Sequence, residues 1–206
     1  MARTLVIETA TAACSVALID SGALIAESHA EVGRGHAERL VPMIAALPDG
    51  GRADAILVDC GPGSFTGIRV GIAAARGLGF GWGVPVHGLS SLPLVAAGAF
   101  ARNPGSDALA VVLEGGHGEV FMAAYDRQFA QIAPFASLKP DAALAQLGGR
   151  IAVGNGVRHL AALDDSLDLR EALPRAADAR LLPAALTALP PRPIYGRAPD
   201  AKPKAA

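Results

Sequence analysis

The sequence predicts an α/β protein of two lobes, each built from one repeated strand–helix unit. Each half of the 206 residues opens with three strand-like apolar segments and then adds helix-like ones. A polar, turn-rich stretch, "RNPGSD" at 102–107, separates the halves. Hydrophobic residues make up 51% of the chain and charged residues 18%, so there is enough apolar material for a core in each lobe.

The first half alternates short apolar runs with helical periodicity. Leu40, Met43, Ile44 and Leu47 recur at helical spacing after His36, and Pro48 with two glycines ends that helix. The expected strands are 3–9, 14–20, 23–31, 55–60 and 84–90, and the expected helices are 36–47, 66–79 and 91–101.

The second half predicts a less regular version of the same order. Its expected strands are 108–115, 118–126, 131–138 and 150–155, and its expected helices are 142–147 and 179–189. We expect a first lobe at 1–102, a smaller second lobe at 103–192, and a proline-rich, partly disordered tail at 193–206.

Composition limits the function classes. The net charge is -1 and the pI is about 6.5, so RNA binding by this chain alone is not expected. Cys14 and Cys60 lie in apolar runs, which indicates buried free thiols in a reducing compartment, with a reactive thiol as the alternative. With no long apolar run and no signal peptide expected, we predict a cytoplasmic protein that contacts no membrane.

A glycine-rich loop, "DCGPGSFTGIR", resembles a phosphate-binding loop but fits none of its templates. A Walker A loop needs a lysine after its last glycine, where Ile68 stands. Gly61, Gly63 and Gly67 give a spacing one residue too long for a dinucleotide fingerprint. The loop therefore indicates a structural turn with a hydroxyl cap on the next helix, and anion contact stays as the alternative.

The helix after the loop is crowded with small residues. Glycine inside a helix costs roughly 0.5–1 kcal/mol against alanine, so several glycines need a compensating close contact. That contact is either packing within the lobe or a subunit interface. Arg69 and Arg76 lie seven residues apart on one face, either as solvated charges or as a rim of that interface.

Catalytic and metal-binding patterns are weak. His36 has Leu40 four residues later, so the chain lacks a paired-histidine metal motif, and we predict no metal site. Glu8, Asp59 and Glu114 each end an apolar strand and could cluster in a cleft between lobes. Such strand-end acids are common without catalysis, and we predict no catalytic set.

Several motifs occur in an order that resembles a known family. These are "ETATAACSVAL", "HAERLVPMI", "GPGSFTGIRVGIAAARGL", "GEVFMAAYD" and "PIYGRAPDA". In this order they resemble the bacterial TsaB family, also called YeaZ. The resemblance implies the two-lobed actin/Hsp70-like (ASKHA) ATPase superfold, with a ribonuclease-H-like core in each lobe. Glu8 and Glu114 depart from the family's usual aspartates.

The resemblance also implies a function and partners. Members help to form N6-threonylcarbamoyladenosine at position 37 of tRNAs that read codons starting with A. The chain would be a non-catalytic activating subunit without cofactor, forming a heterodimer with the transferase TsaD and a homodimer through the same surface. ATP and metal would belong to the partners: the ATPase TsaE docks on the heterodimer, TsaC supplies the activated intermediate, and tRNA is contacted only through the complex.

Carried over residue by residue, the resemblance places the interface on the two helices of the first lobe. The expected interface residues are His36, Arg39, Leu40, Met43, Ile44, Gly67, Ile68, Gly71, Ile72, Ala75, Arg76 and Gly79. On this assignment Gly71→Leu leaves the monomer folded and breaks pairing. Candidate anion or nucleotide contacts are Glu8, Thr11, Ser64 and Thr66. The alternative functions are an ATP-dependent phosphotransferase or ATPase of the same superfold, and a metallopeptidase.

Overall fold

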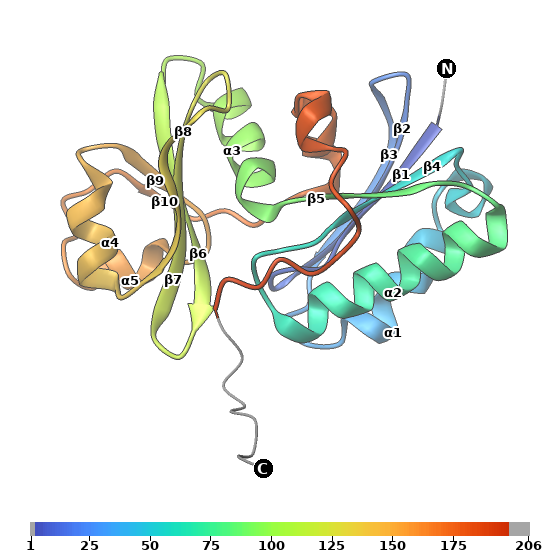
Figure 1. The fold of residues 1–206 in the computed structure, drawn as a ribbon, viewed down its shortest axis with the longest axis horizontal. Helices are drawn as coiled ribbons and strands as arrows, with labels where there is room; N and C mark the ends of the chain where they lie inside the picture. The colour runs from blue at the N-terminus through green and yellow to red at the C-terminus, as the bar shows by residue number, and fades with distance from the viewer. Residues whose placement is uncertain (1–2, 198–206) are drawn as a thin grey trace, which may run out of the picture.

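Two five-stranded mixed sheets form the frame of the computed structural model, which describes residues 3–197 (Figure 1). The first sheet has the order β3-β2-β1-β4-β5. Strands β1, β2 and β3 form an antiparallel meander, and β4 and β5 run parallel to β1. The strands are β1 (Arg3–Glu8), β2 (Ala13–Asp20), β3 (Ala23–Glu31), β4 (Ala55–Asp59) and β5 (Val86–Leu89).

The second sheet repeats this plan with the order β10-β9-β6-β7-β8. Here β6, β7 and β8 form the meander, and β9 and β10 are the parallel strands. Its strands are β6 (Ala108–Gly116), β7 (Glu119–Asp126), β8 (Gln131–Leu138), β9 (Ile151–Val153) and β10 (Leu169–Arg170). Each lobe therefore has the ribonuclease-H-like strand order, and the predicted α/β fold with a duplicated unit is confirmed.

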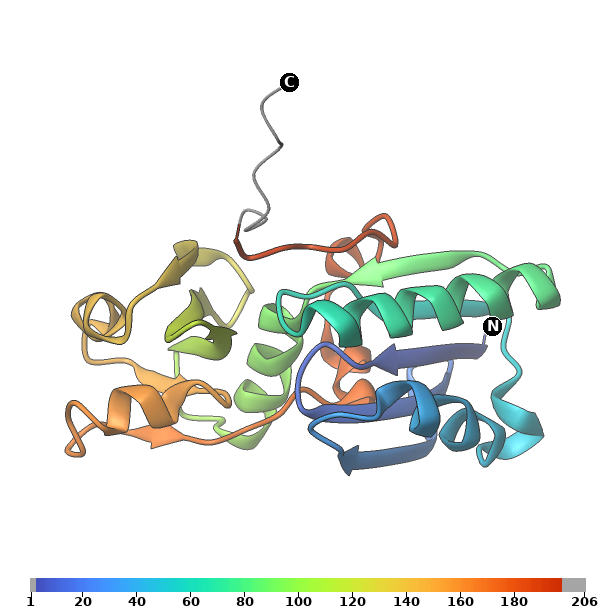
Figure 2. The same ribbon diagram turned by 90° about the horizontal axis from the view of Figure 1, so that it is seen from below.

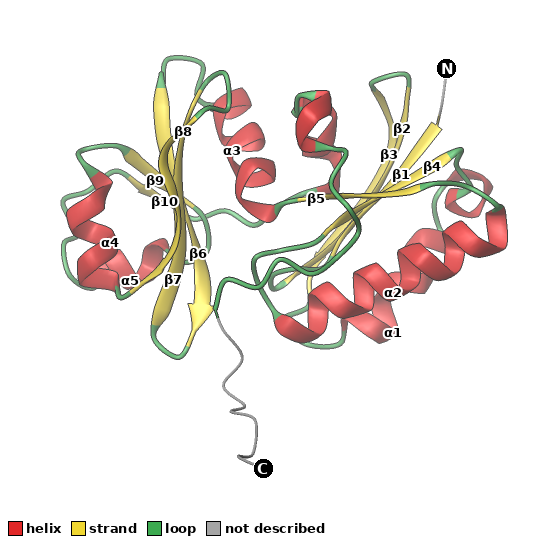
Figure 3. Cartoon of the chain, viewed as in Figure 1, coloured by secondary structure: helices red, strands yellow, loops and turns green. Residues whose placement is uncertain are grey.

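Helices stack with the sheets into five layers (Figures 1 and 3). α1 (His36–Ala45) and α2 (Phe65–Trp82) cover the outer face of the first sheet. α4 (Pro140–Leu147) and α5 (Val157–Ala161) cover the outer face of the second. α3 (Ser91–Arg102) lies between the sheets. Short 3₁₀ turns complete the chain: η1 (Pro48–Gly51), η2 (Ala176–Leu181) and η3 (Ala184–Leu186). In the described residues, none of these helices is long and apolar enough to cross a membrane.

The central helix α3 is buried on every side from Ser91 to Phe100. Leu94 and Ala97 pack against the first sheet, whereas Leu92 and Val95 join the core of the second. A helix that is apolar all round is stable only when neighbours cover its whole circumference. The boundary expected at residue 103 therefore follows a helix that belongs to the packing of both lobes.

The chain returns to the first lobe after β10. The predicted helix at 179–189 is wrong: the segment forms the short turns η2 and η3, and η2 packs on the first sheet. Prolines at 183, 190, 191 and 193 remove the backbone donors that a longer helix needs. Residues 188–197, which we name the C-terminal strap, then run beside the first lobe (Figure 2). Ile194 N donates to Cys60 O at 2.7 Å, so this part of the predicted tail is ordered, and residues 198–206 lie outside the described chain.

Candidate functional site

The glycine-rich loop between β4 and α2 packs directly on the turn between β1 and β2. Ser64 N donates to Ala10 O at 2.6 Å, and a Cβ on Gly63 would collide with the same carbonyl. Ser64 then caps α2, because its hydroxyl accepts from Gly67 N at 3.2 Å. The loop thus performs the structural role expected from the sequence: the missing side chain allows two loops to meet, and the serine begins the helix.

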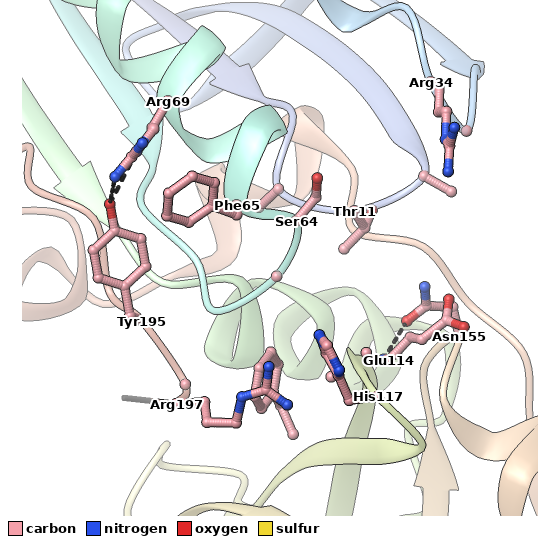
Figure 4. Close-up of a pocket in the computed structure, with 18 residues that line it drawn as sticks. Thr11, Arg34, Ser64, Phe65, Arg69, Glu114, His117, Asn155, Tyr195 and Arg197 are labelled. Atoms are coloured by element: carbon pink, nitrogen blue, oxygen red, sulfur yellow. Dashed lines mark hydrogen bonds between the residues drawn. The ribbon is translucent and has the colours of Figure 1, made fainter. Parts of the chain in front are cut away.

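A cleft of about 1040 Å³ opens beside this loop, between the two lobes (Figure 4). Its first-lobe wall includes Thr11, Arg34 and Ser64, and its second-lobe wall includes Glu114 and Asn155. The C-terminal strap forms a further part of the wall. The complete lining is Ala10, Thr11, Ala12, Gly33, Arg34, Gly63, Ser64, Phe65, Arg69, Glu114, Gly115, Gly116, His117, Phe121, Asn155, Tyr195, Gly196 and Arg197.

An aromatic and cationic cluster joins the strap to the start of α2. The Arg69 guanidinium lies 3.6 Å from the centre of the Phe65 ring, and its Nε and Nη2 donate to the Tyr195 hydroxyl at 3.1 and 3.0 Å. Phe65 and Tyr195 stack with 5.6 Å between ring centres. With Arg34 and Arg197 also on the wall, the cleft favours anions over cations. Sequence reasoning assigned no role to Tyr195, although "PIYGR" was among the motifs.

The four candidate anion contacts are only partly brought together. Thr11 and Ser64 line the cleft, and Thr66 lines a neighbouring pocket at the start of α1 and α2. Glu8 does not reach the cleft: it is fully buried, and its Oε1 accepts from Ala10 N at 2.7 Å. As the last residue of β1, Glu8 lies on the sheet face that packs against α3 and η2, and its carboxyl is held by the turn that follows β1.

The expected cluster of three strand-end acids is also only partly formed. Glu8 and Asp59 end neighbouring strands, β1 and β4, and both are fully buried. Glu114 is exposed at the cleft and accepts from Arg158 Nη2 at 2.6 Å. Glu114 therefore pairs with an arginine at the cleft, whereas Glu8 and Asp59 are enclosed in the first lobe.

Most of the expected interface residues face the core of their own lobe, which corrects the assignment made from the sequence. Arg39 and Arg76 are exposed, and the Arg76 guanidinium donates to Pro191 O at 2.7 Å. The remaining residues are buried: His36, Leu40, Met43, Ile44, Gly67, Ile68, Gly71, Ile72, Ala75 and Gly79. Buried side chains cannot form a contact surface in this conformation.

The small residues of α2 are explained by close packing on the first sheet. A Cβ on Gly67 would meet the carbonyl oxygen of Thr9, and one on Gly71 would meet the Thr9 hydroxyl. The Thr9 hydroxyl donates to Gly67 O at 2.8 Å. His36 similarly fixes α1, with its Nε2 at 2.9 Å from Thr11 O and 3.0 Å from Ala13 O. The sequence left two explanations for these small residues, packing within the lobe and a subunit interface. Their contacts with Thr9 agree with packing within the lobe.

The same two helices carry apolar groups on their opposite side. Val41 on α1 is 60% exposed, and Phe80 on α2 is 93% exposed. Ala73 and Gly77 share the stripe of Phe80 at helical spacing, and a Cβ on Gly77 would meet nothing within 4 Å. We call Val41, Ala73, Gly77 and Phe80 the outer helix face. The sequence did not predict this face, because most of the small residues of α2 lie on its buried side and the interface was assigned to them.

Redox and metal chemistry have few candidates. Cys14 and Cys60 are free and buried, as predicted, and burial raises the pKa of Cys14 to about 11 and that of Cys60 to about 12. Both thiols are therefore protonated and unreactive at neutral pH. Within residues 3–197, no group of three or more His, Cys, Asp and Glu side chains is arranged to hold a metal ion.

Comparison with known proteins shows the relationship over the whole chain. Residues 25–161 match the family model described as "TsaD: tRNA N6-adenosine threonylcarbamoyltransferase". The chain is 40% identical over 131 residues to the tRNA threonylcarbamoyladenosine biosynthesis protein TsaB of Escherichia coli, a match that covers 61% of this chain and 55% of that protein. An uncharacterised protein of Mycobacterium tuberculosis, Rv3421c, is 34% identical over 98% of this chain and 94% of its own length.

Solved structures agree with the sequence matches. A Pseudomonas aeruginosa protein described as similar to the peptidase YeaZ superposes with a TM-score of 0.76 at 30% identity, covering 96% of this chain and all of that one. YeaZ of the same organism superposes with a TM-score of 0.75 at 30% identity, over 88% of this chain and 90% of that one. Given these sequence and structural matches, this chain belongs to the TsaB family, also called YeaZ.

Proposed function

We propose that this chain is a non-catalytic activating subunit in the formation of N6-threonylcarbamoyladenosine on tRNA. The observation that carries the proposal is the family relationship, since the name of the E. coli relative places that protein in this biosynthesis. We assign the chain to the cytoplasm and propose that it acts by binding TsaD, with TsaE docking on the pair. TsaC would supply the activated intermediate, and ATP and metal would be held by the partners.

The outer helix face supports a role in binding a partner. A 93% exposed phenylalanine costs solvation without any gain in the monomer, and an exposed helical glycine weakens its own helix. Both costs are offset when a partner helix packs against the stripe, because Gly77 then allows close approach and Phe80 becomes buried. We therefore move the proposed interface with TsaD, and any self-association, from the buried side of α1 and α2 to this outer face.

An ATPase of the same superfold is the second candidate, and one observation favours it. The cleft of about 1040 Å³ can hold a small molecule the size of a nucleotide, and Arg34, Arg69 and Arg197 lie on its wall. Against it, Glu8, one of the candidate nucleotide contacts, is fully buried and does not line the cleft. The loop beside the cleft also lacks the lysine of a Walker A motif.

Reconstitution distinguishes the two candidates. With TsaC, TsaD, TsaE, ATP, threonine, bicarbonate and unmodified tRNA, the modified nucleoside is expected to form only when this chain is present. The lone chain is expected to turn over no ATP. An equal yield of modified tRNA without the chain would remove the activating role. Steady ATP turnover by the lone chain would instead favour the ATPase.

A further inference from the structure

Two buried carboxyl groups lie at the ends of neighbouring parallel strands, next to the loops that line the cleft. β1 and β4 pair with Ile7 opposite Val58, so Glu8 and Asp59 follow at the same level and on the same face of the sheet. That face is covered by α3 and by η2. Both side chains are 0% exposed.

Each carboxyl has one satisfied oxygen and one without a partner. Glu8 Oε1 accepts from Ala10 N at 2.7 Å. Asp59 Oδ1 accepts from Gly61 N at 2.7 Å and from the Ser91 hydroxyl at 2.8 Å. Glu8 Oε2 and Asp59 Oδ2 are buried without a hydrogen-bond partner. Two ionised carboxylates in this arrangement would leave two charged oxygens unsolvated and close to each other.

The polar and titratable side chains next to the pair on the first sheet carry no charge at neutral pH. The thiols of Cys14 and Cys60 are protonated, for the reasons given above. Ser15 lies beside Glu8 on β2, and its hydroxyl accepts from Ala176 N at 3.0 Å. His29, opposite Ser15 on β3, stays neutral because burial and the Arg175 charge lower its pKa.

The cations of the packed elements are committed elsewhere or lie at the surface. Arg102 at the end of α3 pairs with Asp178 of η2 at 3.4 Å. Arg175, just before η2, pairs with Glu27 of β3 at 2.7 Å. Arg39 on α1 and Arg76 on α2 are exposed on the far side of the sheet. None of these described cations contacts either carboxyl.

We propose that Glu8 and Asp59 form a buried proton-binding site that holds a proton at neutral pH, mainly on Glu8. The Ser91 hydroxyl explains this distribution: each carboxyl accepts from a backbone amide, and Asp59 accepts in addition from this hydroxyl, which favours its ionised form. The pair would then carry a single negative charge between the loops at 9–12 and 61–64. Both loops contribute to the wall of the cleft, so the proton stabilises the frame of that cleft. This inference does not depend on the proposed function.

The pKa directions agree with this geometry. Burial is the largest cause that raises the pKa of Glu8 well above its usual value, and the charge of Asp59 raises it further. Burial also raises the pKa of Asp59 to about 7. In the unfolded chain both groups titrate near pH 4. The folded state thus binds more protons than the unfolded state above that pH, so the stabilisation is complete below about pH 4 and is lost as pH rises through about 7 and beyond.

Urea unfolding between pH 5.5 and pH 8.5 tests the proposal. For the wild type, the folding equilibrium constant is expected to fall about tenfold per pH unit for each proton held by the pair. Glu8→Gln retains the shape of the protonated acid but cannot titrate. The variant is therefore expected to show a pH dependence smaller than the wild type's by the contribution of one proton. The exposed Glu171→Gln is the matched control and is expected to keep the wild-type slope. Equal slopes for the wild type and Glu8→Gln would overturn the proposal.

Two further measurements cover the other outcomes. Carbon NMR of the side-chain carboxyls in the wild type is expected to show Glu8 protonated at pH 7, which needs no variant to fold. An ionised Glu8 signal at that pH would contradict the proposal. Millimolar Mg²⁺, Ca²⁺ or Mn²⁺ is expected to leave the unfolding midpoint unchanged. If one of these ions stabilised the wild type but not Glu8→Gln, the pair would be a metal site instead.

Discussion

Replacing Gly67 with leucine is expected to lower the free energy of unfolding of the first lobe by about 3 kcal/mol or more. The position has no room for a side chain, since even a Cβ would meet the carbonyl oxygen of Thr9. Thr9 belongs to the turn after β1 and cannot rotate away as a flexible side chain could. The clash would separate α2 from the sheet and weaken the cap at Ser64. Urea denaturation followed by far-UV circular dichroism measures the loss.

Gly77→Ala on the same helix is the matched control. A Cβ there meets nothing within 4 Å, and alanine is the better helix former, so the variant is expected to gain roughly 0.5–1 kcal/mol. Gly71→Leu should behave like Gly67→Leu, since a Cβ at Gly71 already meets the Thr9 hydroxyl and Val58. Wild-type stability of Gly67→Leu and Gly71→Leu would contradict the packing of this side of α2 against the sheet and would restore it as a candidate interface.

Replacing Gly77 with arginine is expected to weaken binding to TsaD at least 30-fold, about 2 kcal/mol, without unfolding the chain. Arginine is a better helix former than glycine, so the monomer should gain stability. In the complex, the long charged side chain would occupy the space that the partner's helix needs. Titration calorimetry against TsaD measures the affinity. Sedimentation of the lone chain tests whether self-association uses the same face.

Two variants control for size and for charge. Gly77→Ala adds one methyl group at the same position and is expected to retain most of the affinity. Leu163→Arg places an arginine at a 54% exposed apolar residue of the second lobe, away from α1 and α2, and is expected to bind like the wild type. Unchanged affinity of Gly77→Arg would show that the partner does not pack against the outer helix face.

Local patterns predicted most of the fold. Strands such as β1 and β4 are short apolar runs, α1 has clear helical spacing, and Ser64 before α2 is a typical helix cap. The segment at 179–189 was mispredicted because Ala and Leu favour helix locally, whereas Pro183, the prolines that follow the segment and the contact with the first sheet determine the outcome. The ordered strap up to residue 197 depends on contacts with β4, β5 and α2 that no local pattern records.

The candidate site was harder to predict, because it depends on which side of an element faces the core. The periodicity of α2 gives two stripes, Gly67–Gly71–Ala75 and Ala73–Gly77–Phe80, and both contain small residues. Only the packing on β1 and β4 decides that the first is buried and the second is exposed. Glu8 and Asp59 likewise become neighbours only through the parallel register of β1 and β4. In the sequence, 46 residues lie between the end of β1 and the start of β4.

Activation of the transferase through the outer helix face of this chain can be measured directly. The direct measurement is the yield of N6-threonylcarbamoyladenosine in the reconstituted system with wild-type chain, Gly77→Ala, Gly77→Arg and no chain. We expect full yield with the first two and almost none with the last two at low concentration, with recovery of Gly77→Arg as its concentration rises. Full yield with Gly77→Arg at every concentration, while its binding to TsaD is lost, would contradict the claim.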